Sequence, residues 1–234
     1  MEYGPSSRWF LSAGLFSFIA FGFLGRGVYA GESTSGDAVV FAGNSRGAVA
    51  CVVCHQHDGS GIPDRGYPAL AGLQEAYLFK QLREFKSGKR DHLLMSDTAR
   101  ALSEEEIVGA VRFFSALAPK PIPIPGAGKN PAAPKKLEAG EWIARYGRWE
   151  RQVPACSQCH GKDGQGLGEL FPPLVGQSES YLVQQLKAFK RGRRRNDPNS
   201  LMSTIAKRLT NKEIRAVAAF YSSFRVETEK EKKE

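Results

Sequence analysis

The sequence has few residues that bind metals and lacks patterns that predict strands or a full membrane span. Its 234 residues include four cysteines, four histidines and three methionines. No strand-length alternation of apolar and polar residues competes with helical spacing, which argues against a sheet. The apolar run at residues 9–24 has 16 residues, fewer than the about 20 that a helix needs to cross a bilayer core. We therefore expect a helical fold, in which the few sulfur and imidazole groups are the candidates for chemistry.

All four cysteines fall in two copies of the pattern Cys-x-x-Cys-His. The copies are Cys51, Cys54 and His55, and Cys156, Cys159 and His160. This pattern is typical of covalent haem attachment, in which both thiols form thioethers with the haem vinyl groups and the histidine ligates the iron. A redox dithiol or a four-cysteine zinc site also uses paired cysteines, but neither requires a histidine after each pair. The sequence therefore predicts two covalently bound haem c groups, with His55 and His160 as proximal ligands.

The methionines other than Met1 predict the sixth ligand of each iron. Met95 lies 44 positions after Cys51, and Met202 lies 46 positions after Cys156. A soft thioether is therefore available at nearly the same separation from each motif. Because a methionine more commonly fills a gap in a core, the prediction depends on this pairing and not on the residue type alone.

The two remaining histidines leave the first haem less defined than the second. His92 lies three residues before Met95 and is an alternative distal ligand, which would give a bis-histidine haem. His57 lies two residues past the proximal ligand. We expect His57 to face solvent or to bond a haem propionate, and not to ligate iron.

The sequence around the two motifs is an internal repeat. The first copy has Asp-Gly-Ser-Gly at 58–61, Pro-Ala-Leu-Ala-Gly at 68–72 and a segment from Tyr to Arg at 77–90. The second copy has Asp-Gly-Gln-Gly at 163–166, Pro-Pro-Leu-Val-Gly at 172–176 and the matching segment at 181–194. The offset between the copies changes only from 105 to 104 and then to 107 at the methionines, which small loop insertions explain.

Apolar spacing predicts the same helices in both copies, and therefore an all-α fold of two tandem units that each wrap one haem. Short helices are expected at residues 37–43 and 137–147, the second with Trp142, Ile143 and Tyr146 on its apolar side. Amphipathic helices are expected around Leu78, Leu82 and Phe85 and around Leu182, Leu186 and Phe189. Capping boxes at Ser103 with Glu106 and at Thr210 with Glu213 predict closing helices, whose apolar residues are Ile107, Ala110, Val111 and Phe114, and Ile214, Val217, Ala218 and Tyr221.

Composition predicts the boundaries of these units. The basic start, the apolar run and the small residues up to Ala30 predict a cleaved signal peptide at 1–30, with an uncleaved membrane anchor as the alternative. Export is consistent with the predicted haem attachment, because c-type haem is attached on the outer face of the bacterial cytoplasmic membrane. Six prolines predict an extended linker at 119–136 between domains at 31–118 and 137–226. Each domain is small for a self-sufficient core, so a buried haem would supply apolar area, and the charged tail at 227–234 is expected to fray.

The charge of the chain is concentrated in its second half. Residues 151–234 contain 16 Lys and Arg against 9 Asp and Glu, whereas residues 31–118 contain 9 against 11. Much of this charge belongs to Lys187, Lys190, Arg191, Arg193, Arg194 and Arg195. The cluster predicts either a solvated face, with some arginines on haem propionates, or a dock for an acidic redox partner or an anionic membrane. Nucleic acid is not expected, because the protein is exported and the cluster lacks interleaved aromatic residues.

The order of these motifs, twice over after an export signal, resembles the diheme cytochromes c of the cytochrome c4 type. The resemblance covers residues 36–225 and implies a pair of class I cytochrome c folds with histidine and methionine axial ligands. It also implies a periplasmic electron carrier to terminal oxidases, and makes Pro68 and Pro172 the prolines whose carbonyls orient the proximal imidazoles. Gln56 departs from the family pattern, which has glycine there, as at Gly161.

These features favour electron transfer without chemistry on a substrate, and so a carrier and not an enzyme. Two irons with both axial positions filled leave no position for a substrate. The expected partners are a terminal oxidase, a quinol-oxidising complex or a dehydrogenase, docked through the basic second domain. One alternative is a diheme enzyme of the peroxidase or thiosulfate-oxidising type, which would need a labile sixth ligand. The other is a cytochrome subunit of a dehydrogenase complex.

Overall fold

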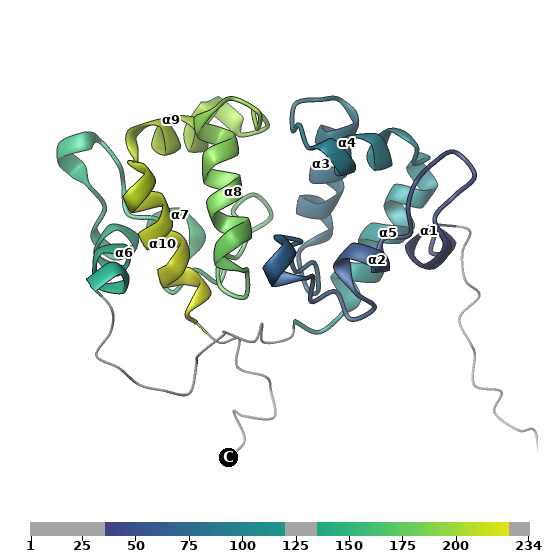
Figure 1. The fold of residues 1–234 in the computed structure, drawn as a ribbon, viewed down its shortest axis with the longest axis horizontal. Coiled ribbons are helices and arrows are strands. Elements are labelled where there is room, and N and C mark those ends of the chain that lie inside the picture. The colour runs from purple at the N-terminus through teal and green to yellow at the C-terminus, as the bar shows by residue number, and fades with distance from the viewer. Residues whose placement is uncertain (1–35, 120–134, 225–234) are drawn as a thin grey trace, which may run out of the picture. The chain divides into compact units, whose positions relative to one another are not determined.

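The computed structural model describes residues 36–119 and 135–224, which belong to one compact unit (Figure 1). Within these residues the regular structure consists of helices and isolated β-bridges. The predicted all-α fold is therefore confirmed. The predicted signal peptide, nearly all of the predicted linker and the charged tail lie outside the described residues.

The α-helices of the second half repeat the order of those in the first. The first half contains α1 (Ala38–Ala42), α2 (Val52–His55), α3 (Glu75–Lys86), α4 (Leu93–Arg100) and α5 (Glu104–Ala116), with the 3-10 helix η1 (Pro63–Arg65). The second half contains α6 (Lys135–Tyr146), α7 (Ser157–His160), α8 (Glu179–Lys190), α9 (Leu201–Arg208) and α10 (Asn211–Ser222), with the 3-10 helices η2 (Trp149–Arg151) and η3 (Pro198–Ser200). The helix expected at 137–147 is α6, which begins two residues earlier.

The first and last helices of each half contact one another, α1 with α5 and α6 with α10. Glycine makes this approach possible. A Cβ atom added at Gly109 would lie 2.3 Å from the carbonyl carbon of Gly36, and one added at Gly140 would lie 2.1 Å from the carbonyl oxygen of Ala216. Since no side chain fits at such distances, the two crossings depend on these glycines. They bring together the two ends of the segment that contains each motif.

The apolar residues predicted for the closing helices form the core of each half. All eight are buried: Ile107, Ala110, Val111, Phe114, Ile214, Val217, Ala218 and Tyr221. Leu78 and Phe85 of α3 and Leu182 and Phe189 of α8 are buried as well, as predicted. Leu82 and Leu186 are half-buried, because they line the cavity described below.

Trp142 and Tyr146 contradict the prediction for α6. Their side chains are 59% and 56% exposed, and their rings lie 4.8 Å apart between centroids. Ile143, predicted for the same side, is buried. The close crossing with α10 at Gly140 turns the face with Ile143 and Ala144 towards the core. The two aromatic residues are four positions apart, and so share a neighbouring face that remains exposed.

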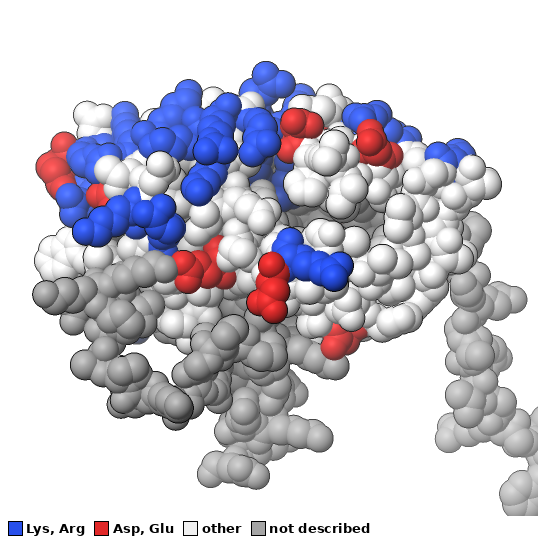
Figure 2. Space-filling model, viewed as in Figure 1, with Lys and Arg blue, Asp and Glu red and all other residues white. Residues whose placement is uncertain are grey.

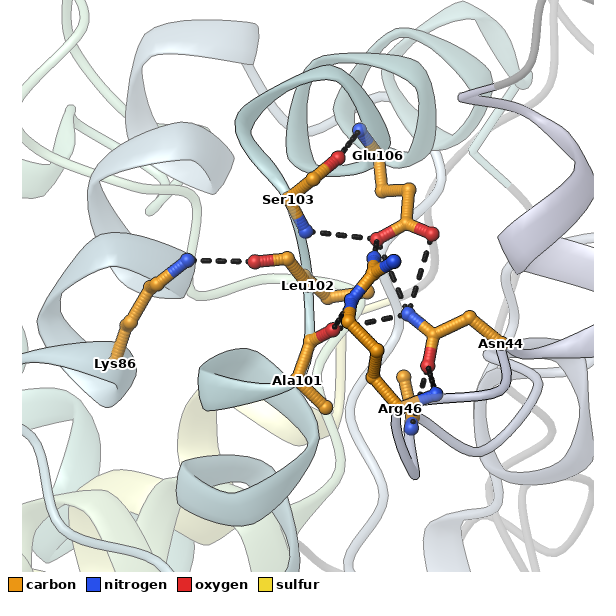
Figure 3. A network of polar contacts seen from close by, with 8 residues as sticks. Asn44, Arg46, Lys86, Ala101, Leu102, Ser103 and Glu106 are labelled. Atoms are coloured by element: carbon orange, nitrogen blue, oxygen red, sulfur yellow. Dashed lines mark hydrogen bonds and ion pairs between the residues drawn. The ribbon is translucent and has the colours of Figure 1, made fainter.

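A polar network attaches the loop after α1 to the start of α5 (Figure 3). The Asn44 side-chain amide donates to the carbonyl of Ala101 at 3.0 Å and to the carboxylate of Glu106 at 3.1 and 3.2 Å. Arg46 donates to the same carbonyl and forms an ion pair with Glu106. The capping box of Ser103 and Glu106 is present as predicted. These contacts fix the segment that leads into α2, where the first motif lies.

The second half has an equivalent arrangement at the start of α10. Thr210 and Glu213 form the predicted capping box, and Arg151 donates to both carboxylate oxygens of Glu213 at 2.7 and 3.0 Å. Burial raises the pKa of Glu213, but hydrogen bonds from Thr210 and Arg151 outweigh it, so the pKa lies below its ordinary value. The carboxylate is therefore the form that stabilises this fold.

Candidate haem sites

Each Cys-x-x-Cys-His motif forms one short helix, α2 or α7. The backbone N–H groups of His55 and His160 donate to the carbonyls of Cys51 and Cys156, in both cases at 2.9 Å. One helical turn places residues three and four positions apart on the same face. The cavity between these helices is therefore lined by Cys51, Cys54, His55, Cys156, Cys159 and His160 together.

Proline carbonyls orient both proximal imidazoles. Nδ1 of His55 lies 3.0 Å from the carbonyl oxygen of Pro68, and Nδ1 of His160 lies 2.8 Å from that of Pro172. Because a carbonyl oxygen only accepts, Nδ1 holds the proton and Nε2 keeps the lone pair that binds a metal. Burial lowers the pKa of both imidazoles, which keeps them neutral, as a metal ligand must be. This is the role that the resemblance implied for the two prolines.

Met95 and Met202 line the same cavity from the first turns of α4 and α9. His92 lines it too, at the N-cap of α4, where its Nδ1 accepts from the backbone N–H of Met95 at 3.4 Å. The structure therefore brings both predicted candidates for the sixth ligand of the first haem to the same place. His57 is exposed, as expected, and its ring stacks on Phe41 with centroids 5.8 Å apart.

The cavity suits an apolar, flat cofactor. Its volume is about 520 Å³, and it is continuous from one motif to the other. Burial raises the pKa of the Cys51 and Cys156 thiols to about 11, so both thiols form part of an uncharged wall. Paired thiols and a neutral imidazole with a fixed proton are the groups that a covalently attached haem requires, and a methionine thioether is a suitable sixth ligand. When bound, the haem supplies the one-electron chemistry of its iron, and the chain holds and orients it.

The wall of this cavity contains a set of polar side chains that we did not predict from the sequence. Arg194, which we had counted with the surface charge, is only 7% exposed. It lines the cavity, and its guanidinium stacks on the ring of Phe189 at 4.4 Å from the centroid. The repeat contained the clue, since the same polar residues recur at a constant offset of 104: Tyr77 and Tyr181, Gln81 and Gln185, Arg90 and Arg194.

Comparisons with known proteins agree with this geometry. The family model "Cytochrome c" matches residues 151–224. A thiosulfate dehydrogenase electron acceptor from Thiomonas intermedia (strain K12) is 43% identical over 178 residues, which cover 75% of this chain and 79% of the relative. The structure of reduced recombinant cytochrome c4 from Pseudomonas stutzeri matches with a TM-score of 0.65 and 30% identity, over 82% of this chain and 98% of that one. The chain belongs to the cytochrome c4 family of diheme cytochromes c. Its relationship to that family spans both halves.

A further structural match is to a protein that is longer than this chain. Thiosulfate dehydrogenase (TsdBA) from Marichromatium purpuratum matches with a TM-score of 0.70 and 40% identity, over 82% of this chain. The chain spans only 40% of the length of that protein.

The family and the geometry together establish a diheme electron-transfer cytochrome with two covalently bound haem c groups. Such a cytochrome has redox protein partners, as the name of the Thiomonas relative indicates for that protein. Within residues 36–119 and 135–224, no helix is both long and apolar enough to cross a membrane.

Proposed function

We propose that each half holds its haem in the same way. The thioethers come from Cys51 and Cys54 in the first half and from Cys156 and Cys159 in the second, the proximal ligands are His55 and His160, and the distal ligands are Met95 and Met202. Residues 31–118 and 137–226 are then the two haem domains, and the linker is 119–136. Because thioethers survive denaturation, the denatured protein should retain two haems per chain after extraction with acidic acetone. Loss of the colour on extraction would contradict covalent attachment.

We infer that the protein is a periplasmic electron carrier and not an enzyme. The observation that supports this most is the presence of a histidine and a methionine at the cavity for both motifs. Two filled axial positions leave no site for a substrate, and a thioether opposite an imidazole raises the reduction potential relative to two imidazoles. Location in the periplasm follows from the predicted export signal and from the place where c-type haem is attached.

A dehydrogenase that oxidises thiosulfate is the donor that we propose, and a terminal oxidase is a suitable acceptor. The donor is suggested by the Thiomonas relative, which is named an electron acceptor of thiosulfate dehydrogenase. The match to the Marichromatium thiosulfate dehydrogenase supports the same choice. A quinol-oxidising complex remains the alternative donor.

The basic surface of the second half is the proposed dock for this partner. Figure 2 shows Lys and Arg gathered over α8 and α9. We define the basic surface as Lys187, Lys190, Arg191, Arg193 and Arg195, and exclude the buried Arg194. Positive charge concentrated on one face accelerates encounter with an acidic partner, and salt weakens this effect.

Reduction of the cytochrome by purified thiosulfate dehydrogenase, followed by stopped-flow absorbance at several ionic strengths, tests the donor and the dock. Reversing Arg191, Arg193 and Arg195 to Glu should slow reduction at low salt and flatten its dependence on salt. A matched control reverses three other exposed cations of the same half, Lys162, Lys212 and Arg215. Equal rates for the two triple variants would refute the dock. Absence of reduction in the unaltered protein would refute the donor.

Binding of carbon monoxide separates the carrier from a diheme enzyme. A carrier with two filled irons should not bind carbon monoxide in the reduced state at neutral pH. Binding at one iron per chain would instead favour an enzyme of the peroxidase or thiosulfate-oxidising type.

A further inference from the structure

Two arginines, one from each half, lie next to each other in the wall of the haem cavity. Arg90 and Arg194 are 6% and 7% exposed, and their backbones form an antiparallel bridge. Beside this bridge, the backbone N–H of Arg195 donates to the carbonyl of Lys89 at 2.7 Å. Both guanidiniums are therefore held at the junction of the two halves.

Each guanidinium is bound by side chains of both halves. Arg90 donates to Oε1 of Gln81 at 2.9 Å in its own half, and to the hydroxyl of Tyr181 at 2.9 Å and Oε1 of Gln185 at 2.7 Å in the other. Arg194 donates to the same oxygen of Gln185 at 2.9 Å and to that of Gln81 at 3.1 Å. The two amide oxygens thus each accept from both guanidiniums.

These two charges have only neutral protein partners among the described residues. Their hydrogen bonds go to amide and hydroxyl oxygens, and their guanidiniums stack on Phe85 and Phe189, both at 4.4 Å from the ring centroid. Burial, and then the neighbouring charge of Arg90, lowers the pKa of Arg194. Two buried charges of the same sign are costly without an anion beside them.

The cavity that these arginines line determines which anion can reach them. Arg90, Arg194 and both histidines of the motifs line one continuous space. Haems attached at the two motifs would occupy this space, and the only carboxylates of a haem are its propionates. Since the arginines lie where the two halves meet, a propionate from each haem can approach the same pair.

We propose that Arg90 and Arg194 form one shared site for propionates of both haems, and that this site couples the reduction potentials of the two irons. Positive charge near a haem favours the reduced iron, which has one positive charge fewer. A change in charge at this site therefore acts on both irons and not only on the nearer one. The proposal requires the bound haems but no particular redox partner, so its test is independent of the proposed donor.

The sharpest test adds a negative charge to Gln185, whose side-chain oxygen already binds both arginines. In Gln185→Glu the added negative charge lies against both guanidiniums, with almost no change of shape, and competes with the propionates. Optical redox titration of the isolated holoprotein should show both one-electron steps at lower potentials. The control is Gln152→Glu, the same change at an exposed position of the second half that does not line the cavity, which should shift both steps much less.

A second pair of variants removes the charge itself. Arg194→Gln should lower both potentials more than Arg195→Gln, which removes an exposed charge from the neighbouring residue. Arg194→Lys keeps the charge and should restore most of the loss. The count of covalent haems per chain checks that each variant matures. Should Arg194→Gln fail to mature, Gln185→Glu still decides the question.

Two results would overturn the proposal. If Gln185→Glu shifts only one of the two steps, the arginines serve a single haem and the site is not shared. If neither step shifts more than in Gln152→Glu, the arginines only hold the two halves together.

Discussion

Gln56 and Gly161 occupy the same position, directly after the histidine of each motif, and both have a positive φ, 62° and 85° respectively. With ψ at 159°, Gln56 lies in a region of backbone space that is almost reserved for glycine. The residue thus adopts a strained conformation at the end of α2, where the second half uses the residue suited to it. The conformation itself is kept in both halves because the chain must reverse there to bring the proline carbonyl to the histidine.

Replacing Gln56 with glycine should therefore stabilise the first half. Such backbone strain costs on the order of 1–3 kcal/mol, from which the greater freedom of glycine in the unfolded chain subtracts part. We expect Gln56→Gly to raise the free energy of unfolding by about 1 kcal/mol in denaturant titration of the holoprotein. Gly161→Ala, at the equivalent position, should lower it. A loss of stability in Gln56→Gly would mean that the glutamine side chain contributes more than its backbone costs.

The repeat and the two haem motifs predicted most of the fold, because they depend on local spacing. Capping boxes such as Thr210 with Glu213 and apolar faces such as Ile107 with Phe114 are encoded within one helix, and the structure contains them as predicted. Trp142 could not be placed this way, because the face that α6 buries is selected by the crossing at Gly140. Arg194 was misplaced for a similar reason, since its burial depends on residues more than 100 positions away in the sequence.

Acid should weaken the second half through Glu213. The folded pKa of this carboxyl is below its ordinary value, so its ionisation stabilises the fold above the unfolded pKa of about 4.3, and this stability is lost as the pH falls through the folded pKa. Glu213→Gln keeps the capping box, in which glutamine can replace glutamate, but removes the charge that Arg151 binds, so it should lower the free energy of unfolding at pH 7 by about 0.5–1 kcal/mol.

The pH dependence distinguishes this effect from a general loss of packing. Unfolding measured from pH 7 to pH 3 should show the difference between Glu213→Gln and the unaltered protein shrinking as the pH falls. Glu169→Gln, a control at an exposed position of the same half, should show little difference at any pH. A difference that stays constant with pH would show that the charge of Glu213 is not what stabilises the cap.

Met202→Ala should open the second iron. Loss of the proposed thioether ligand leaves one axial position free, so the reduced variant should bind one carbon monoxide per chain, and the potential of that haem should fall. The first haem should keep its ligands and its spectrum, because its own histidine and methionine are unchanged. Thr204→Ala, at an exposed position of the same helix outside the cavity lining, is the control and should bind no carbon monoxide. An unchanged spectrum and potential in Met202→Ala would show that this methionine packs in the core and does not ligate the iron.

Met95 and His92 both line the cavity and compete to be the distal ligand of the first haem. Nδ1 of His92 already accepts from the backbone N–H of Met95, an arrangement that uses one ring nitrogen to start α4. We therefore expect Met95 to be the ligand.

A methionine-ligated ferric haem has a weak far-red charge-transfer band from sulfur to iron, which a bis-histidine haem lacks. Met95→Leu should halve this band in the oxidised protein, and His92→Ala should leave it intact while weakening the cap of α4 by about 1 kcal/mol. If His92→Ala instead abolishes the low-spin spectrum of one haem, the first site is bis-histidine. Its potential should then lie below that of the second haem, and electrons would pass from the first half to the second.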